Sequence, residues 1–211
     1  MRTRPLMLLL GLVVLAGCTP TSEGTPRPTA GDPAESTSES PGSNESDGDE
    51  LPFAGAPEVT DPLDTDRFQQ DPCQALTAAQ AQELAVAPGS PYKGELGNAC
   101  KWESTTDSAA FVDVRFLTDD PRGLSALYQA NDDGAYVYFD QLDPIEGYPA
   151  VTRGGTDGRE GGRCTVVTGT SDEDAFEVVL RLSQANVGEK DPCDTAALVA
   201  EMALSTMKEN Q

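Results

Sequence analysis

The stretch CTVVTGTSDEDAFEVVLRL, residues 164–182, decides the fold of this chain. In its second half every other residue is large and apolar: Phe176, Val178, Leu180 and Leu182. The residues between them include Glu177 and Arg181, so the period is two, which is the period of a strand with one buried face. Residues 164–168 predict a second strand just before it. One-sided alternation of this kind indicates an antiparallel sheet with one face toward solvent.

Further strands are predicted on either side of this stretch. Residues 112–116 alternate in the same way, residues 100–103 place Cys100 and Trp102 on one side, and residues 149–151 form a short apolar segment. Each segment is bounded by residues that favour turns. We therefore expect a sheet assembled from strands that are scattered along the second half of the chain.

Three helices are predicted from their starting signals. Thr77 and Gln80 have the spacing of a capping box, which opens a helix that runs to about residue 86. A second helix follows Asp120-Pro121, and a third follows Asp191-Pro192 and runs to about residue 207. With the strands, these helices predict an α+β fold, in which an antiparallel sheet has helices packed on one face.

Four cysteines lie in this part of the chain: Cys73, Cys100, Cys164 and Cys193. In an exported domain an even number of cysteines indicates disulfides, and four allow three connectivities. We favour the pairs Cys73–Cys100 and Cys164–Cys193, because each closes a local loop of about 30 residues. Neither a Cys-x-x-Cys motif nor a histidine is present, so no metal site is expected.

The N-terminus predicts export. Arg2 and Arg4 precede an apolar run over residues 6–16, which is shorter than the roughly 20 residues of a membrane-spanning helix but suits a signal peptide. The following sequence Leu15-Ala16-Gly17-Cys18 resembles the bacterial lipobox, in which the cysteine thiol takes a diacylglyceryl group and the chain is cut before it. We expect residues 1–17 to be a lipoprotein signal peptide and Cys18 to carry the lipid, palmitate included, at the outer face of the cell membrane.

Residues 18–66 are predicted to be a disordered tether. They are rich in Pro, Ser, Thr, Gly and acids, and between Thr19 and Gln70 acidic residues far outnumber basic ones. Such a composition buries too little apolar surface to offset the entropy of ordering. The tether would reach about 40 Å and hold a disulfide-bonded α+β domain, residues 67–211, away from the membrane.

The composition excludes several classes of function. The net charge of −22 repels nucleic acids, so no nucleic-acid partner is expected. The chain contains no histidine, which removes the Ser-His-Asp and Cys-His catalytic systems and the imidazole zinc sites. We therefore predict no catalytic residue and no cofactor, and we expect a protein that is not an enzyme.

The ordered motifs of the domain resemble a known family. They are, in order, Asp71-Pro72-Cys73, Leu76-Thr77, Cys100-Lys101-Trp102, Gly147-Tyr148-Pro149-Ala150-Val151, Cys164 and Asp191-Pro192-Cys193. With the lipobox, this set resembles the actinobacterial lipoproteins grouped as domain of unknown function 3558, over about residues 68–208. The resemblance implies a cell-envelope lipoprotein with disulfides and a compact α+β fold, and it implies no catalytic residue.

Candidate binding residues are few. The acidic clusters at 119–120, 132–133 and 172–174 lack the pattern of a calcium loop and are expected to be solvated. The run Tyr136-Val137-Tyr138-Phe139 is unusual in an aromatic-poor chain. It predicts either a partly buried strand or, through Tyr136, Tyr138 and Phe139, one wall of a binding cleft.

Two functional hypotheses follow from these features. The first is a non-enzymatic binding or sensing module, anchored to the membrane by its lipid, that engages an envelope protein. The second is a carrier or receptor for a small-molecule or lipidic ligand, which predicts a closed apolar pocket of several hundred Å³.

Overall fold

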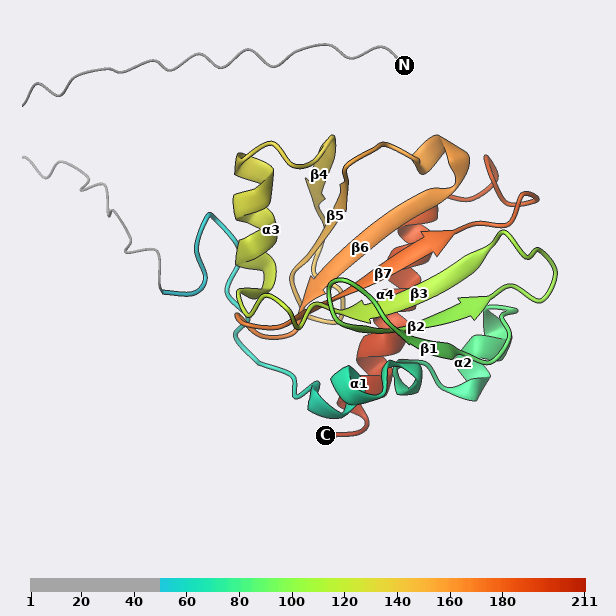
Figure 1. Cartoon of the computed structure of the whole chain (residues 1–211), viewed down its shortest axis with the longest axis horizontal. Helices are drawn as coiled ribbons and strands as arrows, with labels where there is room; N and C mark the ends of the chain where they lie inside the picture. Colours follow the sequence, from blue (N-terminus) through green and yellow to red (C-terminus); the bar gives the residue numbers. More distant parts are fainter. Residues whose placement is uncertain (1–49) are drawn as a thin grey trace, which may run out of the picture. The chain divides into compact units, whose positions relative to one another are not determined.

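The computed structural model describes residues 50–211, which form an α+β domain built on one seven-stranded sheet (Figure 1). The expected signal peptide, Cys18 and the first part of the expected tether lie outside the described residues. The helical segments are α1 (Asp66–Gln70), η1 (Pro72–Ala75), α2 (Ala78–Glu83), α3 (Gly123–Asp132), η2 (Arg159–Gly161) and α4 (Pro192–Lys208). The strands are β1 (Ser90–Lys93), β2 (Asn98–Glu103), β3 (Phe111–Phe116), β4 (Tyr138–Gln141), β5 (Ala150–Gly154), β6 (Arg163–Gly169) and β7 (Ala175–Arg181).

The sheet is antiparallel throughout, in the order β1-β2-β3-β7-β6-β5-β4. The stretch of residues 164–182 forms the hairpin of β6 and β7 near the middle of the sheet, so both strands are flanked on both sides and most of their residues are buried. The α+β class and the antiparallel sheet are thus confirmed. No helix among residues 50–211 is long and apolar enough to cross a membrane.

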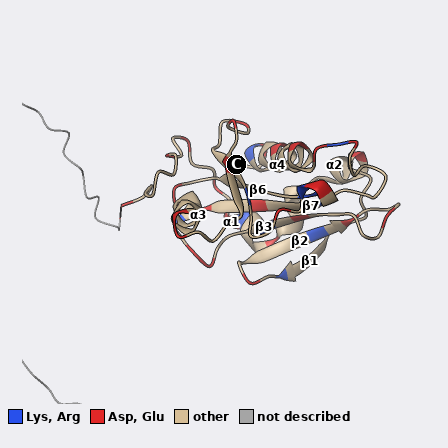
Figure 2. Cartoon of the chain, turned by 90° about the horizontal axis from the view of Figure 1, so that it is seen from above, with Lys and Arg blue, Asp and Glu red and all other residues tan. Residues whose placement is uncertain are grey.

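The main core lies between one face of the sheet and α4. Across the central strands, Val114 lies opposite Val178, which lies opposite Val166, and all three are fully buried. α4 lays its apolar stripe on this face: Ala196, Val199, Ala200, Ala203, Leu204 and Met207. Small alanines let the helix approach the sheet closely, and the burial of this stripe supplies most of the packing energy of the helix. Figure 2 shows α4 and α2 on the same side of the sheet.

The beginning of α4 follows directly from its sequence. The Asp191 carboxylate accepts hydrogen bonds from the backbone N–H groups of Cys193 and Asp194, at 2.7 and 3.1 Å. Pro192 occupies the first turn, where its missing N–H costs nothing. The capping box of α2 is also present, because Thr77 accepts from Gln80 N while the Gln80 side chain accepts from Thr77 N. α2 ends at Glu83, earlier than expected.

Two disulfides join the helical layer to the sheet. Cys73–Cys100 links η1 to β2, and Cys164–Cys193 links β6 to α4. These are the pairs favoured by the spacing of the four cysteines. Each bond joins two elements that face each other over the main core. Each also closes a loop in the unfolded chain, which lowers the conformational entropy of that chain.

One helix corrects the expectation that all helices pack on a single face. α3 lies against the opposite face, where Leu124, Leu127 and Tyr128 form a smaller core with Val151 and Val167 of the sheet. Because side chains alternate along β6, Val166 belongs to the main core and Val167 to the smaller one. Here we call the face that carries Val167 the second face; α3 covers one end of it.

The expected tether extends too far. Residues 51–65 do not form a disordered linker; they pack on the domain and belong to it. Val59 and Leu63 are buried, and the backbone N–H groups of Phe53, Val59 and Leu63 donate to Ser125 Oγ, Asp172 Oδ1 and the Thr170 carbonyl. A few well-placed apolar side chains outweigh the polar average composition of this segment. The domain therefore begins near residue 51 rather than 67.

Candidate functional site

The second face of the sheet gathers the charged residues of its strands. All the charged side chains of β2, β3, β5, β6 and β7 share this face by strand alternation: Lys101, Glu103, Asp113, Arg115, Arg153, Arg163, Glu177 and Arg181. Figure 1 looks onto this face, with α4 behind the sheet. Beyond α3 the helices leave the face uncovered, so its exposed charges, such as Arg163 and Glu103, can contact a ligand or partner.

Four of these residues form a largely buried ion network. Glu177, which is only 2% exposed, accepts from Arg115 Nη1 at 3.1 Å and from Arg153 Nη2 at 2.6 Å. Arg115 also binds Asp113, with its Nε 3.0 Å from Asp113 Oδ1. Burial acts to lower the pKa of Arg115, but the carboxylates of Asp113 and Glu177 outweigh it and hold the pKa above its ordinary value. Two arginines and two carboxylates give the network a formal charge of zero.

Tyr92 of the edge strand β1 closes the network on one side. Its hydroxyl donates to Asp113 Oδ2 at 2.7 Å and accepts from Arg115 Nε at 2.9 Å. Burial and the hydrogen bond to the Asp113 carboxylate raise the pKa of Tyr92 to about 12. The phenol is therefore a proton donor to the network at neutral pH.

Arg153 occupies the centre of the site because it borders two separate hollows. Its guanidinium lies 5.2 Å from the centre of the Tyr136 ring and binds Glu177 through Nη2. Its Nε is buried and has no hydrogen-bond partner among the described residues. A buried donor without an acceptor is costly, so this group calls for an explanation.

The first hollow has a volume of about 220 Å³ and lies where β5 ends and β6 begins. Tyr138, Arg153, Arg163 and Phe111 line it, together with the glycine-rich loop that follows β5. Gly154 is required here because a Cβ at this position would lie 2.5 Å from Tyr138 Cε1. The absence of a side chain lets the tyrosine ring rest on the backbone and keeps the hollow open.

The second hollow is a groove of about 390 Å³ between α3 and the sheet. Its walls are mainly apolar: Leu96, Leu117, Ala126, Leu127, Ala130 and Tyr136. Asp119, Asp120 and Arg122 lie at its rim, where Arg122 binds Asp120 through two hydrogen bonds. Those hydrogen bonds lower the pKa of the Asp120 carboxyl. The groove opens to solvent and is not a closed pocket.

The three aromatic residues expected to line a cleft are divided between core and surface. Phe139 contacts Tyr128 edge to face at 5.0 Å and stacks with Tyr136 at 5.8 Å, so it belongs to the smaller core. Tyr136 borders the groove and Tyr138 borders the first hollow. Burial raises the pKa of both tyrosines, so neither presents a phenolate at neutral pH. Arg153 lies between them.

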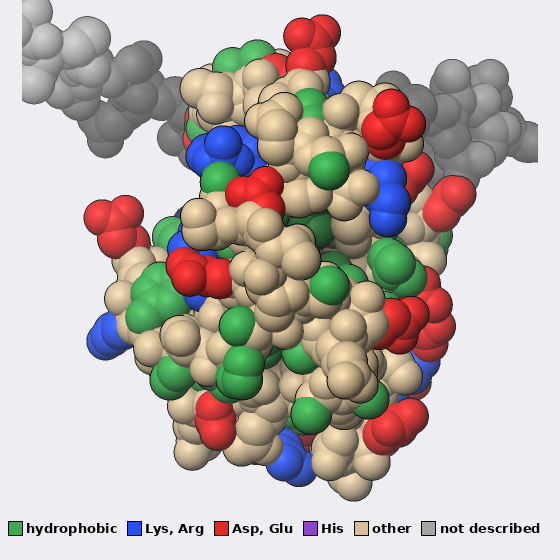
Figure 3. All heavy atoms as spheres, turned by 90° about the vertical axis from the view of Figure 1, so that its right-hand side faces the viewer, with side chains coloured by type: hydrophobic (Ala, Val, Ile, Leu, Met, Phe, Trp, Pro, Cys, Tyr) green, Lys and Arg blue, Asp and Glu red, His purple; other side chains and the backbone are tan. Residues whose placement is uncertain are grey.

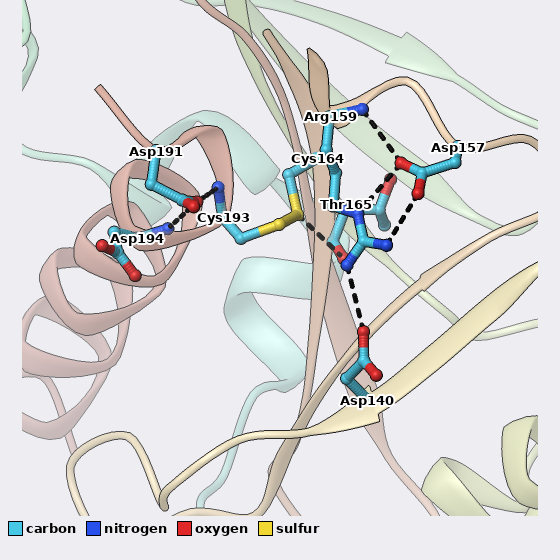
Figure 4. A network of polar contacts seen from close by, with 8 residues as sticks. All are labelled: Asp140, Asp157, Arg159, Cys164, Thr165, Asp191, Cys193 and Asp194. Atoms are coloured by element: carbon cyan, nitrogen blue, oxygen red, sulfur yellow. Dashed lines mark hydrogen bonds and ion pairs between the residues drawn. A yellow bond between two sulfur atoms is a disulfide. The ribbon is translucent and has the colours of Figure 1, made fainter. Parts of the chain in front are cut away.

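A second polar cluster holds the glycine-rich loop in place (Figure 4). Arg159 binds Asp157 through two nitrogens, at 2.9 and 2.7 Å, and reaches Asp140 of β4 at 3.1 Å. Its guanidinium lies 4.1 Å from the centre of the Tyr138 ring. The hydrogen bonds from Arg159 lower the pKa of Asp157 to about 2. Arg159 is thus fully engaged and serves to position Tyr138.

Sequence reasoning missed the ionic part of the site. Glu177, Arg115 and Asp113 occupy the polar positions of alternating strands, which is the ordinary pattern of a solvated face. The spacing along the chain carries no signal for them, because it is the register of β3 against β7 that places Glu177 directly opposite Arg115. Among residues 50–211 no group of three or more Cys, Asp or Glu residues is arranged to hold a metal ion, the acidic clusters included.

Comparison with known proteins identifies one match. The family described as "Protein of unknown function (DUF3558)" matches residues 13–206, which is most of the chain. No curated protein and no solved structure matches it.

Proposed function

The chain belongs to the DUF3558 family, and from this premise we propose that it is a non-enzymatic binding module. A lipid on Cys18 holds it at the outer face of the cell membrane, and its binding face is the second face of the sheet. The observation that carries the binding role is the position of Arg153. This side chain borders both hollows, is held by Glu177 and keeps one buried donor without an acceptor.

The energetics of the network support a role in recognition. Buried ion pairs add little to stability compared with apolar residues of similar volume, since desolvation offsets their attraction. A sheet that needed only stability could fill these largely buried positions with apolar residues. Charged groups that are fixed in place give a partner directional hydrogen bonds and electrostatic complementarity instead. We therefore infer that the network is retained for binding.

The proposed address rests on the N-terminal sequence. Leu15-Ala16-Gly17-Cys18 follows an apolar run of signal-peptide length, and two acyl chains on one cysteine suffice for stable anchoring. Growth with a fatty-acid probe should label the wild-type chain and leave the Cys18→Ser variant unlabelled. An unlabelled wild-type chain would remove the anchor from the proposal.

The binding face is tested by photo-crosslinking in intact cells. A photoreactive phenylalanine analogue replaces Lys101, which lies on the second face, or Glu201, which is exposed on the outer side of α4. We expect one discrete adduct from position 101 and none from position 201. Equal products from both positions, or none from 101, would contradict the assignment of the face.

The groove along α3 favours a second candidate, a carrier of a small or lipidic ligand. Its volume of about 390 Å³ and its apolar walls suit such a ligand, although the groove is open on one side. Native mass spectrometry of the purified chain distinguishes the two. A co-purified small molecule that is lost in Ala126→Trp, which fills the groove, would favour the carrier; a bare chain favours the binding module.

A further inference from the structure

We propose that Arg163 and Arg181 bind the oxyanion of a small ligand, a carboxylate or a phosphate, whose remainder enters the hollow beside Tyr138. This inference rests on the proposed function, since it names the class of ligand for the same face of the sheet. The position of these two arginines and the charge around them support it.

The register places the two arginines directly opposite each other. Arg163 begins β6 and Arg181 ends β7, and they are cross-strand partners on the second face. Opposed residues of adjacent antiparallel strands have Cβ atoms only about 5 Å apart, and like charges in this position are destabilising. Among residues 50–211 neither arginine forms an ion pair with a carboxylate. An anion bound between them would remove this repulsion.

The charge of this face is opposite in sign to that of the chain. The charged side chains of β2, β3, β5, β6 and β7 comprise five basic residues and three acidic ones, an excess of two positive charges. The whole chain carries −22. A basic strip on an acidic protein selects anions locally and does not bind extended polyanions, which the rest of the surface repels. Figure 3 views the end of the domain where β7 ends and β6 begins, and shows basic side chains interspersed with acidic ones.

Nearby acids do not occupy the arginines. Asp107 is near enough to Arg181 to sense its charge, but its carboxylate accepts from the backbone N–H groups of Gln184 and Ala109, at 2.8 and 3.0 Å. Those hydrogen bonds, with a smaller contribution from Arg181, lower the pKa of Asp107. Glu103 is paired with Lys101 and Glu177 with Arg115 and Arg153. The donors of Arg163 and Arg181 therefore remain free for a ligand.

The surroundings indicate the size of the ligand. Phe111 lies opposite Arg181 on the other side and, with Tyr138 and Arg163, lines the hollow of about 220 Å³. This volume is below the roughly 300–1,000 Å³ of sites for drug-sized molecules, so it accepts one small ring. Gly158 leaves room for Arg163, because a Cβ at position 158 would lie only 3.2 Å from the Arg163 Cβ. Arg163 lines the hollow and Arg181, its cross-strand partner, lies next to Phe111 at its border. Two aromatic walls and this pair of arginines suit a compact ring that bears one oxyanion.

The test is a titration of the full-length chain in a neutral detergent, followed through the Nε–Hε resonances of its arginines by nuclear magnetic resonance. The probes are inorganic phosphate and D-glucuronate, with D-glucose and sodium chloride of matched ionic strength as controls. We expect saturable shifts at Arg163 and Arg181 with at least one oxyanion and with neither control. Response to phosphate alone assigns a phosphorylated ligand, and response to glucuronate alone assigns a carboxylate.

Variants separate binding from structure. Arg163→Gln and Arg181→Gln should each weaken the oxyanion by about tenfold or more, as expected for a lost charge-assisted hydrogen bond. Without ligand, both should raise the midpoint of thermal unfolding, whereas a merely structural arginine would lower it. Lys93→Gln, an exposed charge on β1, should change neither.

Absence of saturable shifts with both oxyanions, or equal weakening by Lys93→Gln, would overturn the inference. If the discrete adduct from position 101 still formed in that case, the proposed binding face would stand and only the ligand class would fall. If anion binding were intact but position 101 formed no adduct, the ligand class would stand and the proposed partner on the binding face would fall.

Discussion

Arg153 donates to Glu177 at 2.6 Å, and the same carboxylate accepts from Arg115 through its second oxygen at 3.1 Å. One nearly inaccessible acid therefore holds two arginines of different strands in fixed positions. This relationship links β3, β5 and β7 across the second face, and it orients the arginine that borders both hollows. The first prediction concerns the loss of this acid.

Glu177→Gln should destabilise the domain strongly. The amide keeps the shape but removes the charge, which leaves Arg153 without an ionic partner in a largely buried position. Breaking one side of a buried pair costs about 3 kcal/mol. Urea unfolding measures the change in the free energy of unfolding. Glu173→Gln, an exposed acid in the β6–β7 turn, is the control, and an equal effect of the two variants would show that the network contributes nothing.

Alkaline titration should reveal the hydrogen bond between Tyr92 and Asp113. The pKa of Tyr92 is raised from 10.0 to about 12, so its stabilising effect is present below pH 10 and is lost as the pH rises toward 12. Absorbance near the phenolate band should therefore show a late-ionising tyrosine in the folded protein. Tyr92→Phe should remove this late ionisation step. If the substitution instead removed a step near pH 10, the hydrogen bond to Asp113 would be contradicted.

Residues 51–65 should contribute to stability as part of the domain. Leu63 is 6% exposed within the main core, and Leu63→Ala should cost about 2–4 kcal/mol, as for other buried leucines. Leu96→Ala provides the matched control, because this leucine is 43% exposed. Chemical denaturation of both variants measures the difference. If Leu63→Ala proved as harmless as its control, this segment would be a linker after all.

The disulfide between β6 and α4 should be worth roughly 3 kcal/mol in the loop-entropy description. The double variant Cys164→Ala, Cys193→Ala removes a link that spans 29 residues and should lower the free energy of unfolding by that amount. Non-reducing peptide mapping of the wild-type chain checks the pairing itself. A peptide that joins Cys73 to Cys164 would refute the connectivity.

Much of the fold was predictable because its signals are local. The alternation of residues 176–182, the capping box at Thr77 and the Asp191-Pro192 start of α4 each depend on neighbours in the chain, and each has its expected structure. Average composition gave the wrong prediction for residues 51–65, because a few apolar residues determine whether this segment packs on the domain. Val59 and Leu63 are sparse in a polar segment, but both reach the core.

The candidate site was less predictable because its chemistry arises from register. Nothing in the spacing of Arg115, Arg153 and Glu177 along the chain indicates that they meet; the pairing of β3 with β7 and of β5 with β6 brings them together. The same holds for Arg163 and Arg181, which are 18 positions apart in sequence and opposite each other in the sheet. The aromatic run at 136–139 did indicate the region, since Tyr136 and Tyr138 border the two hollows.

The most direct measurement of the central claim is arginine footprinting with phenylglyoxal, compared between intact cells and the purified full-length chain. The reagent reports which guanidinium groups are accessible, and mass spectrometry reads each site separately. Arg163 and Arg181 should be protected in the cell and reactive after purification, while Arg67, an exposed arginine of α1, should react equally in both. Equal reactivity of all three arginines in both states would mean that nothing covers this face, and the account would be wrong.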